Sequence, residues 1–173
     1  MNTLDFFRAI MPDEGVYYLA LIDKNTGRVA HRAFSTLEEL TLGVAEFDKS
    51  ESLNVYHACA SYKEPFIEVD GKKKYRVPEN WHKAKSFWID LDCGEDKVAK
   101  GDGYLTKRDA AEAVVRFCTE HDFPRPMFVD SGNGVHCYWP LTKSIKPEVW
   151  KALANALKAV LAAAGVLADP TCT

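Results

Sequence analysis

In the second half of the chain, apolar and polar positions alternate in short runs that predict β-strands. The run SFWIDLD at residues 86–92 has an apolar side chain at every second position from Phe87 to Leu91, which is the periodicity of a strand. Its two aspartates, Asp90 and Asp92, are two residues apart and therefore lie on the same face. Because a buried carboxylate is costly unless it is paired or binds a metal, this face is either solvated or functional.

The elements that follow this strand predict an α+β domain. Thr106 and Asp109 form a capping-box pattern at the start of one helix, and a second helix begins at Pro147 and ends at Gly165. In chain order the predicted elements are a strand at 86–92, a helix at 106–121, strands at 126–130 and 135–141 joined by the turn SGNG, a helix from 147, and a strand that begins at 166–169. The expected apolar face of the second helix comprises Trp150, Leu153, Leu157, Val160 and Leu161. This βαββαβ order is typical of the ferredoxin-like or RRM-like fold.

The first 62 residues predict a separate αββαβ module that packs beside this sheet. Its expected elements are a helix at 4–12 stopped by Pro12, a hairpin of strands at 16–23 and 28–35 around KNTG, a helix from a capping box of Ser35 and Glu38, and a strand at 53–62. The next stretch is polar and irregular, and residues 71–85 carry six Lys or Arg against one Glu. The expected domains are therefore a module at 1–62, a basic connecting segment at 63–85, and an RRM-like domain at 86–173 whose last strand is expected to be incomplete.

Composition excludes few classes of protein. Of the residues, 47% are hydrophobic and 27% are charged, which is ordinary for a globular domain. The net charge of −3 does not by itself suggest a nucleic-acid partner. The five cysteines contain no CxxC pair. Together with the lack of a signal-like or membrane-spanning apolar run, they predict reduced thiols in a cytoplasmic protein without a membrane partner.

The predicted topology brings distant polar residues together. In a ferredoxin-like sheet the first and third strands are antiparallel neighbours, and the fourth strand lies on the other side of the first. Asp90 and Asp92 are therefore expected beside His136 on one neighbouring strand and Asp169 on the other. Three carboxylates suit two Mg²⁺ or Mn²⁺ ions, and backbone N–H groups of the SGNG turn suit a triphosphate. This combination indicates nucleotidyl transfer.

Three segments in this order, FWIDLDCG, VDSGNGVHCYWPL and LADPT, resemble the motifs of the archaeo-eukaryotic primase superfamily, in particular the primase-polymerases of phages and plasmids. The resemblance runs from about residue 54 to residue 173. Family members continue past the third acid with a further strand and an arginine-containing segment, so the chain is expected to be an N-terminal fragment.

The resemblance implies a DNA-templated primase-polymerase for replication priming. Its substrates would be NTP or dNTP on a single-stranded DNA template, and such enzymes are often fused to a replicative helicase. By position, Asp90, Asp92 and Asp169 match the acids that hold the catalytic metals. The positions that match or adjoin the triphosphate-binding motif are Ser131, Gly132, Gly134 and His136. Apart from these motifs, Lys83 and Lys85 stand just before the acidic strand, and one interpretation of them is that they face the template or the triphosphate, with Lys85 a candidate nucleotide-binding residue.

Each feature also has a structural interpretation. The acidic pair can be a solvated strand end, SGNG an ordinary hairpin turn, and the basic stretch a solvated loop. Trp88 and Tyr138 are expected on the acidic face, where they either pack against the N-terminal module or stack on bases. The alternative function is a nucleotide- or single-stranded-DNA-binding module of a replication initiator without catalysis of its own. A rolling-circle nuclease needs paired histidines, and VHCYW contains one.

Overall fold

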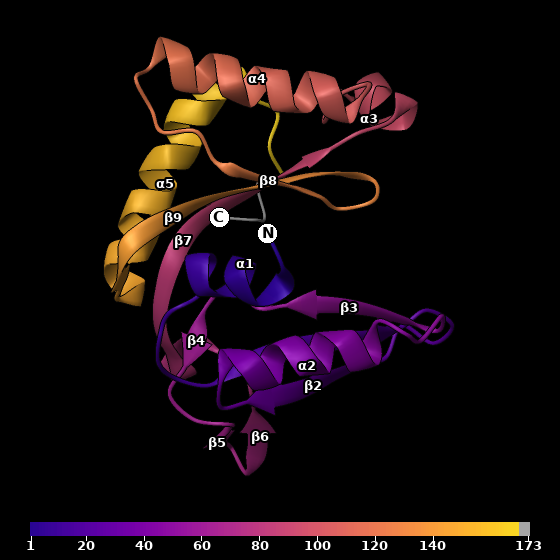
Figure 1. Cartoon of the computed structure of the whole chain (residues 1–173), viewed down its shortest axis with the longest axis vertical. Helices are drawn as coiled ribbons and strands as arrows, with labels where there is room; N and C mark the ends of the chain where they lie inside the picture. Colours follow the sequence, from indigo (N-terminus) through magenta and orange to yellow (C-terminus); the bar gives the residue numbers. More distant parts are fainter. Residues whose placement is uncertain (170–173) are drawn as a thin grey trace. The chain divides into compact units, whose positions relative to one another are not determined.

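The computed structural model describes residues 1–169, which form two units. Unit 1 comprises Met1–Lys85 and Thr142–Pro147, and unit 2 comprises Ser86–Leu141 and the chain from Glu148 onward. Helices and antiparallel strands are both abundant, so the prediction of an α+β fold is confirmed at this level (Figure 1). Within the described residues, no helix is long and apolar enough to cross a membrane.

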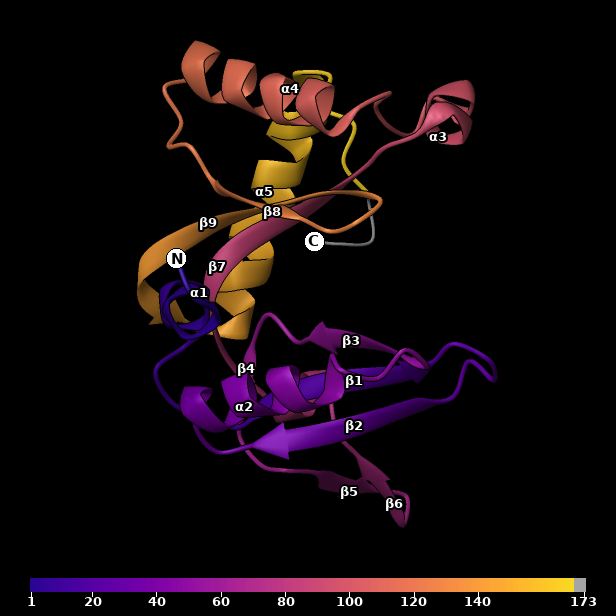
Figure 2. The ribbon, with the colours of Figure 1, turned by 45° about the vertical axis from the view of Figure 1, so that its right-hand side comes forward.

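Unit 1 contains a three-stranded sheet covered by a helix. The expected hairpin is confirmed, because β1 and β2 pair antiparallel from Tyr17–Phe34 to Ile22–Val29, and β3 pairs with the other edge of β1. Helix α2 lies along the hairpin (Figure 2). The bounds are α1 Thr3–Ile10, β1 Tyr17–Asp23, β2 Val29–Phe34, α2 Leu37–Phe47 and β3 Leu53–His57.

The cap of α2 differs from the predicted one by one residue. Thr36, and not Ser35, is the N-cap, and its hydroxyl accepts a hydrogen bond from the Glu39 N–H at 3.1 Å. The Glu39 carboxylate in turn accepts from the Ser35 N–H at 2.8 Å. The segment STLEE offers two overlapping N-cap positions, and the helix that begins at Leu37 uses the second, Thr36, while Glu39 reaches back to Ser35 rather than to the N-cap residue.

Residues 53–85 are divided differently from the prediction. The expected strand at 53–62 breaks after His57, and β4 (Ser61–Tyr62) pairs with a different sheet, at the start of β7. The expected irregular stretch contains a small hairpin of β5 (Ile67–Val69) and β6 (Lys72–Lys74), followed by the 3₁₀ turn η1 (Pro78–Asn80). The hairpin turns at Asp70 and Gly71, whose φ angles of 52° and 68° are typical of such tight turns.

The second sheet has the strand order β4-β7-β9-β8. Its long strand β7 begins at Trp81 rather than at residue 86 and, like β9, contributes residues to both units. The capping box of Thr106 and Asp109 at the start of α4 is confirmed. The bounds are β7 Trp81–Asp92, α3 Glu95–Lys100, α4 Lys107–Glu120, β8 Met127–Asp130, β9 Gly134–Ile145 and α5 Pro147–Ala163.

The core of unit 2 explains the alternation that was read from the sequence. Ile89 and Leu91 of β7 are buried with residues of β9 and of both long helices; the helical members include Val114, Phe117, Leu157 and Leu161. Helix α5 contacts this core through a narrower face than predicted, because Leu153 and Val160 are 49% and 46% exposed. Its buried residues are Trp150, Ala154, Leu157 and Leu161.

Trp88 has a partner in unit 2 that was not predicted. Its ring stacks on Trp150 of α5 at 4.6 Å between centroids, and the Trp150 indole N–H donates to the Ser86 carbonyl oxygen. Trp88 therefore has a packing partner within unit 2, and packing on the N-terminal module and stacking on bases stay predictions. The buried positions change from Ala84 and Ser86 to Ile89 and later odd positions, so strict alternation does not hold across this part of β7.

The predicted last strand is only partly within the described residues. Residues 166–169 are not a strand, and residues 170–173 lie outside the described part of the chain. The Asp169 N–H nevertheless donates to the Asp90 carbonyl oxygen at 2.9 Å, so the chain at Asp169 lies beside β7.

Candidate functional site

The end of β7 lies directly beside the start of β9. The Cys93 N–H donates to the Asn133 carbonyl oxygen at 3.1 Å. At Gly134 the backbones approach so closely that a Cβ atom would lie 2.2 Å from the Leu91 carbonyl oxygen. Glycine is therefore required at this position by the strand contact itself, and the contact brings His136 to the acidic face of β7.

His136 and Asp90 form the central pair of the site. His136 Nε2 lies 3.5 Å from Asp90 Oδ1, and the two side chains are 33% and 28% exposed. On the other side of the ring, the Tyr138 hydroxyl lies 3.5 Å from His136 Nδ1. The imidazole is thus contacted at both nitrogens, which orients it at the surface of the sheet.

Asp169 reaches the same place through the segment that follows α5. Gly165 ends the helix with a φ of 74°, and the Val166 N–H donates to the Leu161 carbonyl oxygen. The Tyr104 hydroxyl then accepts a hydrogen bond from the Leu167 N–H at 2.9 Å. These contacts lead the chain back to β7, where the Asp169 N–H donates a hydrogen bond to the Asp90 carbonyl oxygen.

Asp92 has a partner that the sequence analysis did not identify. Its Oδ2 atom accepts a hydrogen bond from Lys97 Nζ of α3 at 2.6 Å. This hydrogen bond is the main cause that raises the pKa of Lys97 above its usual value, and burial acts in the opposite direction. No helix was predicted for the stretch GEDKVAKGDG, although its acidic start and terminal glycine are the signals of a short helix.

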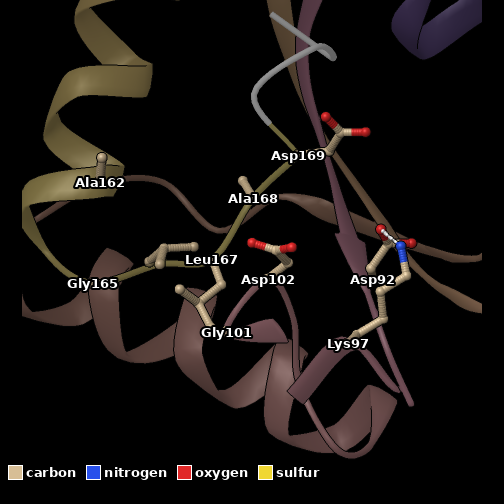
Figure 3. Close-up of a pocket in the computed structure, with 10 residues that line it drawn as sticks. Asp92, Lys97, Gly101, Asp102, Ala162, Gly165, Leu167, Ala168 and Asp169 are labelled. Carbon is tan, nitrogen blue, oxygen red and sulfur yellow. Dashed lines mark hydrogen bonds and ion pairs between the residues drawn. The ribbon is translucent and has the colours of Figure 1, made fainter. Parts of the chain in front are cut away.

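Asp92 and Lys97 lie at one side of a cavity of about 460 Å³, a volume in the range of small-molecule sites. Figure 3 shows the two side chains meeting, with Asp102 and Asp169 also at the cavity. The remaining lining residues are small or apolar and come from the loop after α3 and the end of α5: Gly101, Ala162, Gly165, Val166, Leu167 and Ala168.

The SGNG turn is held by its own hydrogen bonds. Asp130 Oδ1 accepts from the Gly132 N–H at 2.8 Å and from Lys107 Nζ at 2.6 Å, and the Ser131 N–H donates to the Gly134 carbonyl oxygen. The bond from Lys107, followed by that from Gly132, lowers the pKa of Asp130. Two of the N–H groups that were expected to face a triphosphate are therefore engaged within the turn.

Lys85 is not among the residues that unit 2 brings together around Asp90. It belongs to unit 1, where its ammonium donates to Asp13 Oδ1 at 2.8 Å and to the Arg8 carbonyl oxygen at 3.1 Å. Its side chain is only 14% exposed. These contacts explain Lys85 as a structural residue of unit 1.

The donors around the end of β7 are of the type that Mg²⁺ and Mn²⁺ prefer. Asp90, Asp92 and Asp169 supply hard carboxylate oxygens, and Asp92 already holds a cation, the Lys97 ammonium. Within residues 1–169, no three His, Cys, Asp or Glu side chains are close enough together to form a ready set of metal ligands. The residue types fit such ions, and the fit requires Asp92 to exchange its present partner.

Comparison of the chain with known proteins identifies no relative. No protein-family model, no curated protein and no solved structure matches the chain. The interpretation of the site therefore depends on the geometry around Asp90 and on the resemblance of three short motifs.

Proposed function

We propose that this protein is a primase-polymerase of the archaeo-eukaryotic type, which transfers nucleotides from NTP or dNTP onto a primer on single-stranded DNA. Unit 2 would be its ferredoxin-like catalytic palm. The neighbour order β7-β9-β8, the helices α4 and α5 in one core, and the return of the chain to β7 at Asp169 support this arrangement.

The observation that carries the proposal is the convergence on Asp90. Its carboxylate is 3.5 Å from His136, and its carbonyl oxygen is bonded to the backbone of Asp169. These residues belong to three motifs that are far apart in the sequence. A solvated strand end and an unrelated hairpin turn give no reason for this convergence.

The proposed roles follow from the chemistry of the side chains. Asp90, Asp92 and Asp169 would hold two Mg²⁺ or Mn²⁺ ions, which when bound activate the primer hydroxyl and stabilise the pyrophosphate that leaves. His136 would donate a hydrogen bond to a phosphate oxygen of the incoming nucleotide. The turn at Ser131, Gly132 and Gly134 would keep His136 in register with the acids.

A primer-extension assay tests the proposal. The purified protein, a labelled primer on a single-stranded template, Mn²⁺ and either dNTP or NTP should give extended products. Asp90→Asn keeps the shape of the side chain and removes its charge, and we expect a loss of extension of about 10²- to 10³-fold. Asp96→Asn, on an exposed residue of α3, is the matched control and should retain activity. Full activity of the Asp90→Asn variant contradicts the proposal.

The same preparation distinguishes the alternative function. A non-catalytic binding module should bind a nucleotide triphosphate or single-stranded DNA in calorimetry, show no extension, and be indifferent to Mn²⁺. A primase-polymerase should require the metal for tight triphosphate binding. In the cell, the proposed enzyme would work in the cytoplasm with a replicative helicase on phage, plasmid or bacterial DNA.

A further inference from the structure

The loop between β7 and α4 is closed onto the end of the acidic strand. The Tyr104 N–H donates to the Asp92 carbonyl oxygen, and the Gly94 N–H donates to the Tyr104 carbonyl oxygen, each at 2.9 Å. A Cβ atom at Gly103 would lie 2.4 Å from the Asp92 carbonyl oxygen and 2.9 Å from Lys97 Cβ. The loop backbone therefore packs tightly against both residues.

This loop packing fixes the position of the Lys97 backbone, from which its side chain extends. The Lys97 carbonyl oxygen accepts hydrogen bonds from the Gly101 and Asp102 N–H groups, which holds the last turn of α3 in place. From there the ammonium reaches Asp92 Oδ2 at 2.6 Å, with the two side chains 34% and 31% exposed. The pair is half-buried at the edge of the cavity, where it is less screened than a surface ion pair.

We propose that Lys97 occupies the cation position of Asp92 in the free protein, and that it has to leave before Asp92 can bind a divalent ion. This inference rests on the proposed function, because it takes Asp92 as a metal ligand. An ammonium and a divalent cation cannot share one carboxylate oxygen at close range without strong repulsion. Lys97 therefore competes with the metal and lowers the affinity of the site.

The side chain is suited to such an exchange. Lysine carries a compact charge on a flexible stem, so it can move without a change in the backbone that holds its Cα atom. Asp102 lines the same cavity and supplies another carboxylate for the displaced ammonium. Because Lys97 balances the charge of Asp92, the repulsion between Asp92 and the neighbouring carboxylates is weaker in the free protein.

The chain contains a matched control pair. Lys107 and Asp130 form an ion pair with the same distance of 2.6 Å in unit 2. Asp130 is not one of the proposed metal ligands, and its other hydrogen bond is to Gly132. Replacing Lys107 removes one positive charge from the unit without releasing a site carboxylate.

The test is a titration with Mn²⁺ in which free Mn²⁺ is measured by its electron paramagnetic resonance signal, without nucleotide or DNA. Lys97→Met removes the charge and keeps the stem, and it should bind Mn²⁺ about three- to tenfold more tightly than the wild type, the range of a partly exposed ion pair. Lys97→Arg keeps the ion pair and should bind no more tightly than the wild type. Lys107→Met should be within about twofold of the wild type.

An Asp92→Asn variant separates the two levels of the proposal. One outcome is that the wild type binds Mn²⁺, that Asp92→Asn weakens this binding, and that Lys97→Met leaves it unchanged. In that case the metal site stands and the role of Lys97 is refuted. If neither the wild type nor Lys97→Met binds Mn²⁺ at millimolar concentration, the proposed function and this inference both fail. Urea midpoints of all variants, compared with the wild type, identify any change that arises from altered folding.

Discussion

His136 Nε2 lies 3.5 Å from Asp90 Oδ1, across the boundary between β9 and β7. The pair depends on Gly134, where the two backbones approach too closely for any other residue. It also depends on the burial of Ile89 and Leu91 on the opposite face, which turns Asp90 toward the surface. The geometry of the candidate site is therefore a property of the strand contact.

Replacing His136 by Ala should impair catalysis without unfolding the domain. The ring is proposed to donate to a phosphate oxygen, and removal of one such donor typically lowers the rate about 10²- to 10³-fold. Steady-state primer extension with Mn²⁺ measures the effect. His121→Ala, at the exposed C-cap of α4, is the control. A rate for His136→Ala equal to that of the control contradicts the assignment.

Gly134→Ala should separate β9 from β7. The new methyl group would meet the Leu91 carbonyl oxygen, a backbone atom that cannot move alone. We therefore expect the free energy of unfolding to fall by about 1–3 kcal/mol or more. Hydrogen exchange at the Cys93 amide, which is bonded to the Asn133 carbonyl oxygen, should become faster.

Gly132→Ala is the control for this change. Gly132 has a φ of 92° and nothing near its missing Cβ atom, so the substitution causes backbone strain of about 1–2 kcal/mol within the turn only. Protection of the Cys93 amide should remain. An equal rate of hydrogen exchange at the Cys93 amide in the two variants argues against the contact between β7 and β9.

Leu91→Ala should destabilise unit 2 strongly. Leu91 is fully buried in the core between the sheet and the long helices, and such truncations cost about 2–5 kcal/mol. The matched substitution Leu153→Ala removes the same atoms from a position that is 49% exposed, and should change stability by about 0.5 kcal/mol or less. Urea unfolding measures both. A large effect at Leu153 indicates that α5 packs through that face in solution.

Thr36→Ala should lower the stability of unit 1 by about 1 kcal/mol, because it removes the hydroxyl that accepts from the Glu39 N–H. Ser35→Ala keeps the backbone N–H that donates to Glu39 and should be nearly neutral. The two urea midpoints give a direct comparison of neighbouring residues. A larger effect at Ser35 supports the cap predicted from the sequence over the one in the structure.

The stability of unit 1 should fall as the pH is lowered below about 6.5, the ordinary pKa of histidine. Burial, and then the nearby charge of Arg76, lower the pKa of His31, whose ring stacks on Tyr75 at 5.5 Å. The unfolded chain therefore takes up the proton more readily than the folded chain, and protonation favours unfolding. As the pH falls, this loss of stability begins near the pKa of His31 in the unfolded chain and ends below its lowered pKa in the folded chain.

His31→Gln removes the titrating group and should reduce this dependence. The measurement is the difference between urea midpoints at pH 7.5 and pH 5.5, for the wild type and the variant. His121→Gln, at an exposed position, should keep the full dependence of the wild type. If the urea midpoint changes between the two pH values by the same amount in the wild type and in His31→Gln, His31 is not the source of the pH dependence.

Elements with local signals were predicted well. The hairpin of β1 and β2, the capping box of Thr106 and Asp109, and the start of α5 at Pro147 all depend on neighbouring residues, and all are confirmed. The break between β3 and β4 was not predicted, because it depends on pairing with β7. The stacking of Trp88 on Trp150 was not predicted for a related reason: Trp150 lies far away in the sequence.

By itself, the sequence determined that Asp90 and Asp92 share one face of a strand whose other face is buried. The two-residue period of a strand requires this, and the apolar positions Ile89 and Leu91 identify the buried face. The predicted strand order also put His136 beside this acidic pair, but only the tertiary structure decided that His136 faces Asp90 and that Lys97 pairs with Asp92. An ion pair forms between groups that the fold brings within a few ångströms, and no period along one strand specifies which distant segment will lie beside it.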